Sequence, residues 1–224
     1  MSSRLLSPTL IWSLTALFLL VPLAMAQEDA SGAPGSGAEA ASGFTFKTRE
    51  VDLKLVFLAA ARQAKANLIL HGDVGGTVTV DVTGVEPLGF IEKYAQERGY
   101  VVREATLGGP RPGRIILPEA AAAAYDQLST IDDGEEEAGA DSPADFNLDM
   151  MRGRLFDLVT QLRKPLGAKI IGTYPGDNWL GVSAKEVQPL RLLHALAHTA
   201  GTAVTTKTDE TGLVYVVGPA PAGE

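Results

Sequence analysis

The sequence predicts a mixed α/β (α+β) fold divided into two small domains of the same kind. Residues 44–104 align with residues 146–206 at a constant offset of 102 without a gap, and the coincident positions are core and turn residues such as Leu53 with Leu155. Repetition on this scale indicates duplication of one structural unit. Strand and helix patterns follow the same order in both stretches, and Ala/Gly-rich segments precede and separate them. We therefore expect each repeat to build its own core.

The first 26 residues are typical of a secretory signal peptide. Arg4 precedes an apolar run at 10–23, and a small-x-small motif ends at Ala26. We expect cleavage between Ala26 and Gln27 and a periplasmic location with no membrane span in the mature chain. The alternative is an uncleaved anchor, because the apolar run is nearly long enough to cross a bilayer.

Composition restricts the class of partner. The chain has a formal net charge of -8 and contains no cysteine. An acidic surface argues against nucleic acid and anionic lipid as main partners. The absence of cysteine excludes disulfides and a bacterial lipoprotein, and no motif indicates a cofactor.

Three segments lack the apolar side chains of a core. Residues 27–43 are expected to form a flexible tether, residues 119–145 an acidic Ala/Gly-rich linker with a short helix at 120–128, and residues 220–224 a tail. The acidic cluster at 132–137 is interpreted as solvated linker. A calcium loop is the alternative, but the cluster lacks the alternating acids of an EF-hand.

The first repeat begins with alternating strand residues from Phe44, followed by Asp52 as a helix cap. Pro87 suits the first position of a second helix, and Gly99 suits the residue after its end. The pattern predicts these elements in order: a strand at 44–47, a helix at 53–66, strands at 67–70 and 77–82, a helix at 87–98, and a hairpin of 100–102 with 114–117.

The second repeat predicts the same order of elements. Pro165 is its main irregularity, because proline disfavours helical geometry in the residue before it, so the first helix should stop or kink there. The expected elements are a strand at 146–150, a helix at 154–166, strands at 168–171 and 179–183, a helix at 189–200, and a hairpin of 203–206 with 213–217.

The first repeat, residues 44–118, resembles the short N-terminal (STN) domain family of secretins and TonB-dependent receptors. The second repeat, residues 146–219, resembles it less closely, because a Tyr-Pro-Gly-Asp-Asn turn and Gly153 depart from the pattern. The residues that carry the resemblance are Phe44-Thr45-Phe46-Lys47, Val51-Asp52-Leu53, Asn67-Leu68-Ile69-Leu70, Asp73-Val74-Gly75-Gly76-Thr77-Val78-Thr79-Val80, Val85, and Gly99-Tyr100.

The resemblance implies a compact module in which two helices lie between a two-stranded and a three-stranded sheet. It also implies that the module contacts other envelope proteins: inner-membrane secretion components in one branch of the family, and an anti-sigma regulator in the other. The chain ends at Glu224 with no barrel segment after the repeats, so we expect no pore.

Two histidines are the only candidates for a metal site. His194 and His198 lie four residues apart on a predicted helix and resemble the zinc-protease helix, but Ala195 replaces the catalytic Glu. No cysteine or nearby carboxylate pair completes a ligand shell, so partly exposed helix histidines are the favoured interpretation. No motif ties a serine or aspartate to a histidine, and no catalytic residue is predicted.

Possible interaction residues lie on two predicted strands. Trp179 follows a turn and replaces a Thr of the first repeat; burial in the core and an exposed interface anchor are both open. The strands at 77–82 and 179–183 alternate polar and apolar residues, so a free edge is expected to offer polar residues such as Thr77, Thr79 and Asp81.

The sequence thus predicts a periplasmic, non-enzymatic interaction or adaptor protein that works with a secretin in a type II secretion or type IV pilus system. One alternative is a signalling module of a TonB-dependent uptake or anti-sigma pathway. The other is a metal-binding or hydrolytic periplasmic protein centred on the two histidines.

Overall fold

The computed structural model describes residues 43–132, 142–174, 178–210 and 212–219. The described residues all belong to one compact unit. The expected leader, its cleavage position between Ala26 and Gln27, the tether up to residue 42, most of the acidic cluster and the tail lie outside the described residues. No helix within the described ranges is long and apolar enough to cross a membrane.

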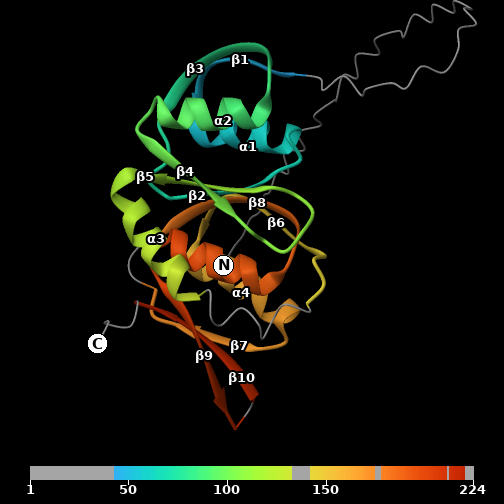
Figure 1. The fold of residues 1–224 in the computed structure, drawn as a ribbon, viewed down its shortest axis with the longest axis vertical. Coiled ribbons are helices and arrows are strands. Elements are labelled where there is room, and N and C mark those ends of the chain that lie inside the picture. The colour runs from blue at the N-terminus through green and yellow to red at the C-terminus, as the bar shows by residue number, and fades with distance from the viewer. Residues whose placement is uncertain (1–42, 133–141, 175–177, 211, 220–224) are drawn as a thin grey trace, which may run out of the picture. The chain divides into compact units, whose positions relative to one another are not determined.

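The mixed α/β fold is confirmed. Five helices and ten strands form within the described residues (Figure 1). In chain order they are β1 (Phe44–Asp52), α1 (Leu53–Gln63), β2 (Asn67–Leu70), β3 (Thr77–Val85), α2 (Pro87–Gln96), β4 (Tyr100–Ala105), β5 (Gly113–Pro118), α3 (Glu119–Asp132), β6 (Phe146–Arg154), α4 (Leu155–Leu166), β7 (Lys169–Gly172), β8 (Trp179–Val187), α5 (Pro189–Thr199), β9 (Ala203–Asp209) and β10 (Gly212–Gly218).

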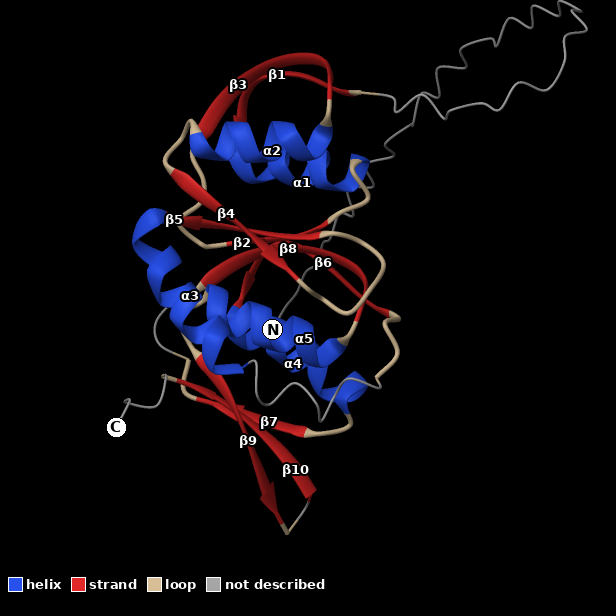
Figure 2. Ribbon diagram, viewed as in Figure 1, coloured by secondary structure: helices blue, strands red, loops and turns tan. Residues whose placement is uncertain are grey.

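Both repeats have the same arrangement of helices and strands. In the first, α1 and α2 lie between the β1–β3 pair and the strands β4-β5-β2; in the second, α4 and α5 lie between β6–β8 and β7-β10-β9 (Figure 2). The strand registers coincide at the offset of 102, since Asp52 pairs with Thr77 where Arg154 pairs with Trp179. The duplication seen in the sequence therefore extends to the backbone register.

Local sequence signals explain the element boundaries. The Asp52 carboxylate accepts a hydrogen bond from the Lys54 backbone N–H at 2.9 Å and caps α1. Pro87 occupies the first turn of α2, and Gly99 after that helix has a φ of +76°, which glycine adopts without strain. Helix α4 ends at Leu166, one residue beyond Pro165, and Gly167 follows in the left-handed conformation.

The two repeats share one sheet. Strand β2 of the first repeat pairs in antiparallel orientation with β8 of the second, which joins five strands in the order β4-β5-β2-β8-β6. This sheet lies between α1 and α2 on one face and α4 and α5 on the other (Figures 1 and 2). The middle of the fold is therefore built by both repeats.

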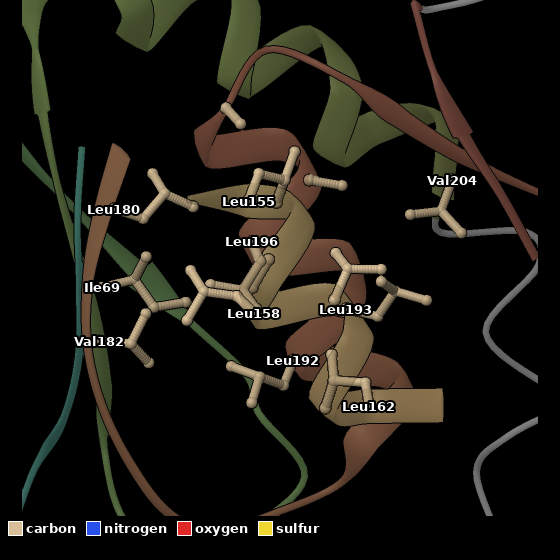
Figure 3. Packing of buried hydrophobic residues seen from close by; sticks show 14 of the residues in the cluster. Ile69, Leu155, Leu158, Leu162, Leu180, Val182, Leu192, Leu193, Leu196 and Val204 are labelled. Carbon is tan, nitrogen blue, oxygen red and sulfur yellow. The ribbon is translucent and has the colours of Figure 1, made fainter. Parts of the chain in front are cut away.

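The expectation that each repeat builds its own core is wrong for the second repeat. Its apolar cluster includes Ile69, Leu107, Ile115 and Leu117 from the first repeat. Figure 3 shows Ile69 and Val182 on the sheet side of this cluster, beside leucines of α4 and α5. The physical reason is that β2 and β5 have two faces, and each face is covered by the helices of a different repeat.

Part of the segment expected to be a linker is an ordered helix. Helix α3 is longer than the predicted 120–128 helix, and it buries Ala122 and Tyr125 in the core of the second repeat. The Arg103 guanidinium on β4 donates two hydrogen bonds, 2.7 and 2.8 Å long, to the Asp126 carboxylate on α3. Apolar burial and this ion pair together hold α3 against the sheet.

Candidate interaction surfaces

Trp179 lies between two arginine side chains. It begins β8 and pairs with Arg154 at the end of β6. The guanidinium carbons of Arg152 and Arg154 lie 4.6 and 5.1 Å from the centroid of the half-buried indole ring. Both distances suit cation–π attraction. We call Arg152, Trp179 and Arg154 the Arg–Trp–Arg cluster.

The helix start beside this cluster differs in charge from its counterpart in the first repeat. Asp52 caps α1, whereas Arg154 occupies the same position before α4 and makes no capping hydrogen bond with its side chain. An arginine is poorly suited to this position, because a helix N-terminus carries partial positive charge and favours oxygen acceptors. Folding alone therefore does not account for Arg154, which makes it a candidate functional residue.

A third cation, Lys54 of the first repeat, lies next to the cluster. The Lys54 ammonium donates to the carbonyl of Gly72 at 2.9 Å. Burial lowers the pKa of Lys54, Asp52 opposes that shift, and the charge of Arg152 adds to it. A side chain at Gly72 would clash with the carbonyl oxygen of Trp179, so the two repeats are closely packed here. A net acidic chain thus places two cations over one aromatic ring and a third near Arg152.

The two guanidinium groups are available to a ligand. Within the described residues, neither Arg152 nor Arg154 is in an ion pair, and their side chains are exposed. Arginine forks bind carboxylates and phosphates in a bidentate way, and Trp and Arg are the residues most enriched at binding hot spots. The cluster is therefore suited to bind an acidic segment of another molecule.

The predicted interaction residues of the first repeat lie at a free sheet edge. Strand β3 pairs only with β1 among the described strands, and Thr77, Thr79 and Asp81 are exposed on it. The Lys47 ammonium lies 2.8 Å from the Asp81 carboxylate across the strand pair. Beside this edge lies a hollow of about 400 Å³, lined by residues that include Val82, Phe90 and Tyr94.

The corresponding prediction for residues 179–183 is wrong. Strand β8 is paired on both edges, with β2 and with β6. Residues 180–184 are all buried, so no polar face points outward. Helices of both repeats pack on the faces of β8, and its small residues Gly181, Ser183 and Ala184 leave room for them.

The two helix histidines lie close together on α5. The rings of His194 and His198 are 5.9 Å apart and edge-to-face, and the ring of Tyr125 lies 6.2 Å from that of His198. His198 is buried, not partly exposed as expected. Across the described ranges, no group of three or more His, Cys, Asp or Glu side chains is placed to hold a metal ion.

Sequence reasoning singled out Trp179 but missed Arg152 and Arg154. The available signal was the charge at aligned positions, because Glu50 and Asp52 of the first repeat are replaced by these two arginines. It also missed the groove beside β3, which depends on the tertiary arrangement of α2.

Comparisons with protein-family models, with curated proteins and with solved structures found no match. The assignment of function therefore depends on the geometry described above and on the resemblance of the first repeat.

Proposed function

We propose that this chain is a periplasmic, non-enzymatic adaptor that binds another envelope protein through the Arg–Trp–Arg cluster. The observation that carries the proposal is the pair of exposed guanidinium groups stacked on Trp179 in a chain whose net charge is -8. A local positive patch on an acidic protein selects partners by the charge of the docking segment, because the rest of the surface repels acids.

The expected ligand is an acidic segment that also offers an apolar or aromatic side chain. Carboxylates pair with Arg152 and Arg154, and exposed Met151 and Leu55 add apolar area on elements that also carry the cations. Such a segment is proposed to belong to a secretin or an inner-membrane component of a type II secretion or type IV pilus system. The resemblance of the first repeat supports this class of partner.

Capture from an envelope extract tests the proposal. The chain from Gln27, which retains every described residue, is immobilised as wild type and as Arg152→Glu. Arg98→Glu is the matched control, because Arg98, which follows α2, also lies over an aromatic ring, that of Tyr94 at 4.6 Å, away from β6 and β8. We expect a secretin-class or secretion-system protein on wild type and control, and its loss from Arg152→Glu. Capture should also weaken as salt is raised.

Two results would contradict the proposal. One is the recovery of the same proteins on wild type and Arg152→Glu, and the other is the absence of any secretion component from the captured set. The signalling alternative predicts a TonB-type or anti-sigma regulator instead, together with altered transcription of an uptake operon when the gene is deleted.

A further inference from the structure

The junction between the two repeats is an interface whose parts occur twice in the chain. Strand β2 supplies one half and β8 the other, in antiparallel register. The paired residues are Leu68 with Ser183, Ile69 with Val182, and Leu70 with Gly181. At the offset of 102, the counterpart of β2 is β7 and the counterpart of β8 is β3.

Both counterparts have an open edge. Among the described strands, β3 pairs only with β1 and β7 only with β10. Each repeat therefore has one strand that corresponds to a junction strand but lacks the junction partner. Strand β3 could accept a β2-like strand, and β7 could donate itself as one. Unpaired strand edges of this kind bind further strands.

The accepting half is the groove beside β3. Its residues Phe90 and Tyr94 on α2 correspond to Leu192 and Leu196 on α5. In the second repeat those leucines are fully buried in the cluster that contains Ile69 of the first repeat. The groove is thus the place that a β2-like strand fills elsewhere in the same fold.

The donating half is the outer face of the sheet β7-β10-β9. Ile171 on this face corresponds to Ile69, yet its side chain is 43% exposed whereas Ile69 is 0% exposed. Ile171 pairs with Val216 as Ile69 pairs with Ile115, so the apolar row is repeated. A hollow lined by Ile171, Thr205 and Val216 lies over it.

Charges at the two open edges are complementary. The Arg163 guanidinium donates to the carbonyl of Ile170 at 3.0 Å. The backbone N–H of Thr173, just after β7, donates to the carbonyl of Val217 on β10. Successive residues of a strand in a parallel pair direct their backbone groups to opposite edges. The Ile170 carbonyl, three residues before Thr173, therefore faces the open edge of β7. In the junction register, the residue opposite Ile170 is Asp81.

We propose that copies of this chain associate head to tail, with β7 of one copy antiparallel to β3 of the next. The register places Ile170 opposite Asp81, Ile171 opposite Val80 and Gly172 opposite Thr79. Ile171 then enters the groove beside α2. Arg163 turns from the Ile170 carbonyl to Asp81, a carboxylate that Lys47 of its own copy also contacts. Because the two surfaces differ, the contact builds rings or filaments and not a closed pair.

The contact between copies is weaker than the β2–β8 contact within the chain. The internal junction contains hydrogen bonds from Lys185 N–H to the Asn67 amide oxygen at 2.7 Å and from Arg62 to Asp149 at 2.8 Å. The equivalent positions between copies carry Lys169 with Thr83 and Lys164 with Lys47, which form no such pairs. The self-association is therefore reversible and depends on concentration.

Sedimentation velocity of the chain from Gln27, over a concentration series, tests this proposal. The average mass is expected to rise past that of two chains. Ile171→Asp is expected to weaken association at least tenfold, and Leu213→Asp, which changes an aliphatic residue with 40% exposure at the far end of β10, is the matched control and leaves it unchanged. Circular dichroism confirms that each variant is folded.

Charge exchange tests the register. Arg163→Glu and Asp81→Arg are each expected to weaken association at least tenfold, and the double variant is expected to restore it to within about threefold of wild type. Three results would overturn the proposal. They are a monomer at every concentration, a species that grows no larger than two chains, and equal association of Ile171→Asp and wild type. Arg152→Glu leaves self-association intact, so failure here is distinct from failure of the proposed function.

Discussion

Replacing Ile69 by alanine tests whether the two repeats fold as one unit. Ile69 lies on β2 in the first repeat, is 0% exposed, and packs in the core of the second. The substitution removes three carbon groups, which at about 0.8 kcal/mol each cost about 2.4 kcal/mol of transfer free energy. The cavity adds to this, and isoleucine-to-alanine changes in cores cost about 2–5 kcal/mol in total. We expect the free energy of unfolding to fall by about 3 kcal/mol.

Urea denaturation followed by two probes measures this effect. Circular dichroism reports both repeats, while Trp179, the single tryptophan after Gln27, reports the second. Both transitions are expected to shift together in Ile69→Ala. Ile171→Ala is the matched control at the aligned exposed position and is expected to change stability by less than about 0.5 kcal/mol. A Trp179 transition that stays in place while the dichroism transition moves would refute a shared core.

Three further predictions concern single contacts. Asp52→Ala removes the α1 cap and is expected to lower the free energy of unfolding by about 0.5–2 kcal/mol in urea denaturation, while Arg154→Ala, which removes no cap, costs less. Hydrogen bonds from Arg103 lower the pKa of Asp126 in the folded protein. The Arg103–Asp126 pair therefore adds to the free energy of unfolding above the unfolded pKa of about 3.9, and this stabilisation is lost as pH falls through the folded pKa. Asp126→Asn should therefore cost about 0.2–1 kcal/mol at pH 7, and thermal melts at acid pH should show no difference from wild type. EDTA is expected to leave the melting temperature unchanged, since the α5 histidines lack a third ligand within the described residues; a metal-dependent shift would contradict this.

The order of elements could be predicted because its signals are local. Strand β2 was predicted with its observed bounds, Asn67–Leu70, and the cap at Asp52 and the left-handed Gly99 were predicted from residue type. Side-chain capping and the conformational freedom of glycine act within a few residues, so a single sequence contains them.

The shared sheet could not be predicted from the same signals. The uninterrupted apolar runs at 68–70 and 115–117 are typical of strands covered on both faces. They do not specify what covers the second face, which here is the pair of helices α4 and α5 of the second repeat. The Arg–Trp–Arg cluster depends on the same pairing, since Arg154 meets Trp179 only through the register of β6 and β8.

Site-specific photo-crosslinking in living cells tests most directly whether the chain binds an envelope protein at this cluster. A photoreactive phenylalanine analogue at position 151, where the Met151 side chain is 45% exposed next to Arg152, leaves the cluster intact. We predict an adduct with a secretion-system protein that disappears when Arg152→Glu is added and is absent with the analogue at Leu213. No adduct at position 151, or an identical adduct in the Arg152→Glu background, would contradict the account.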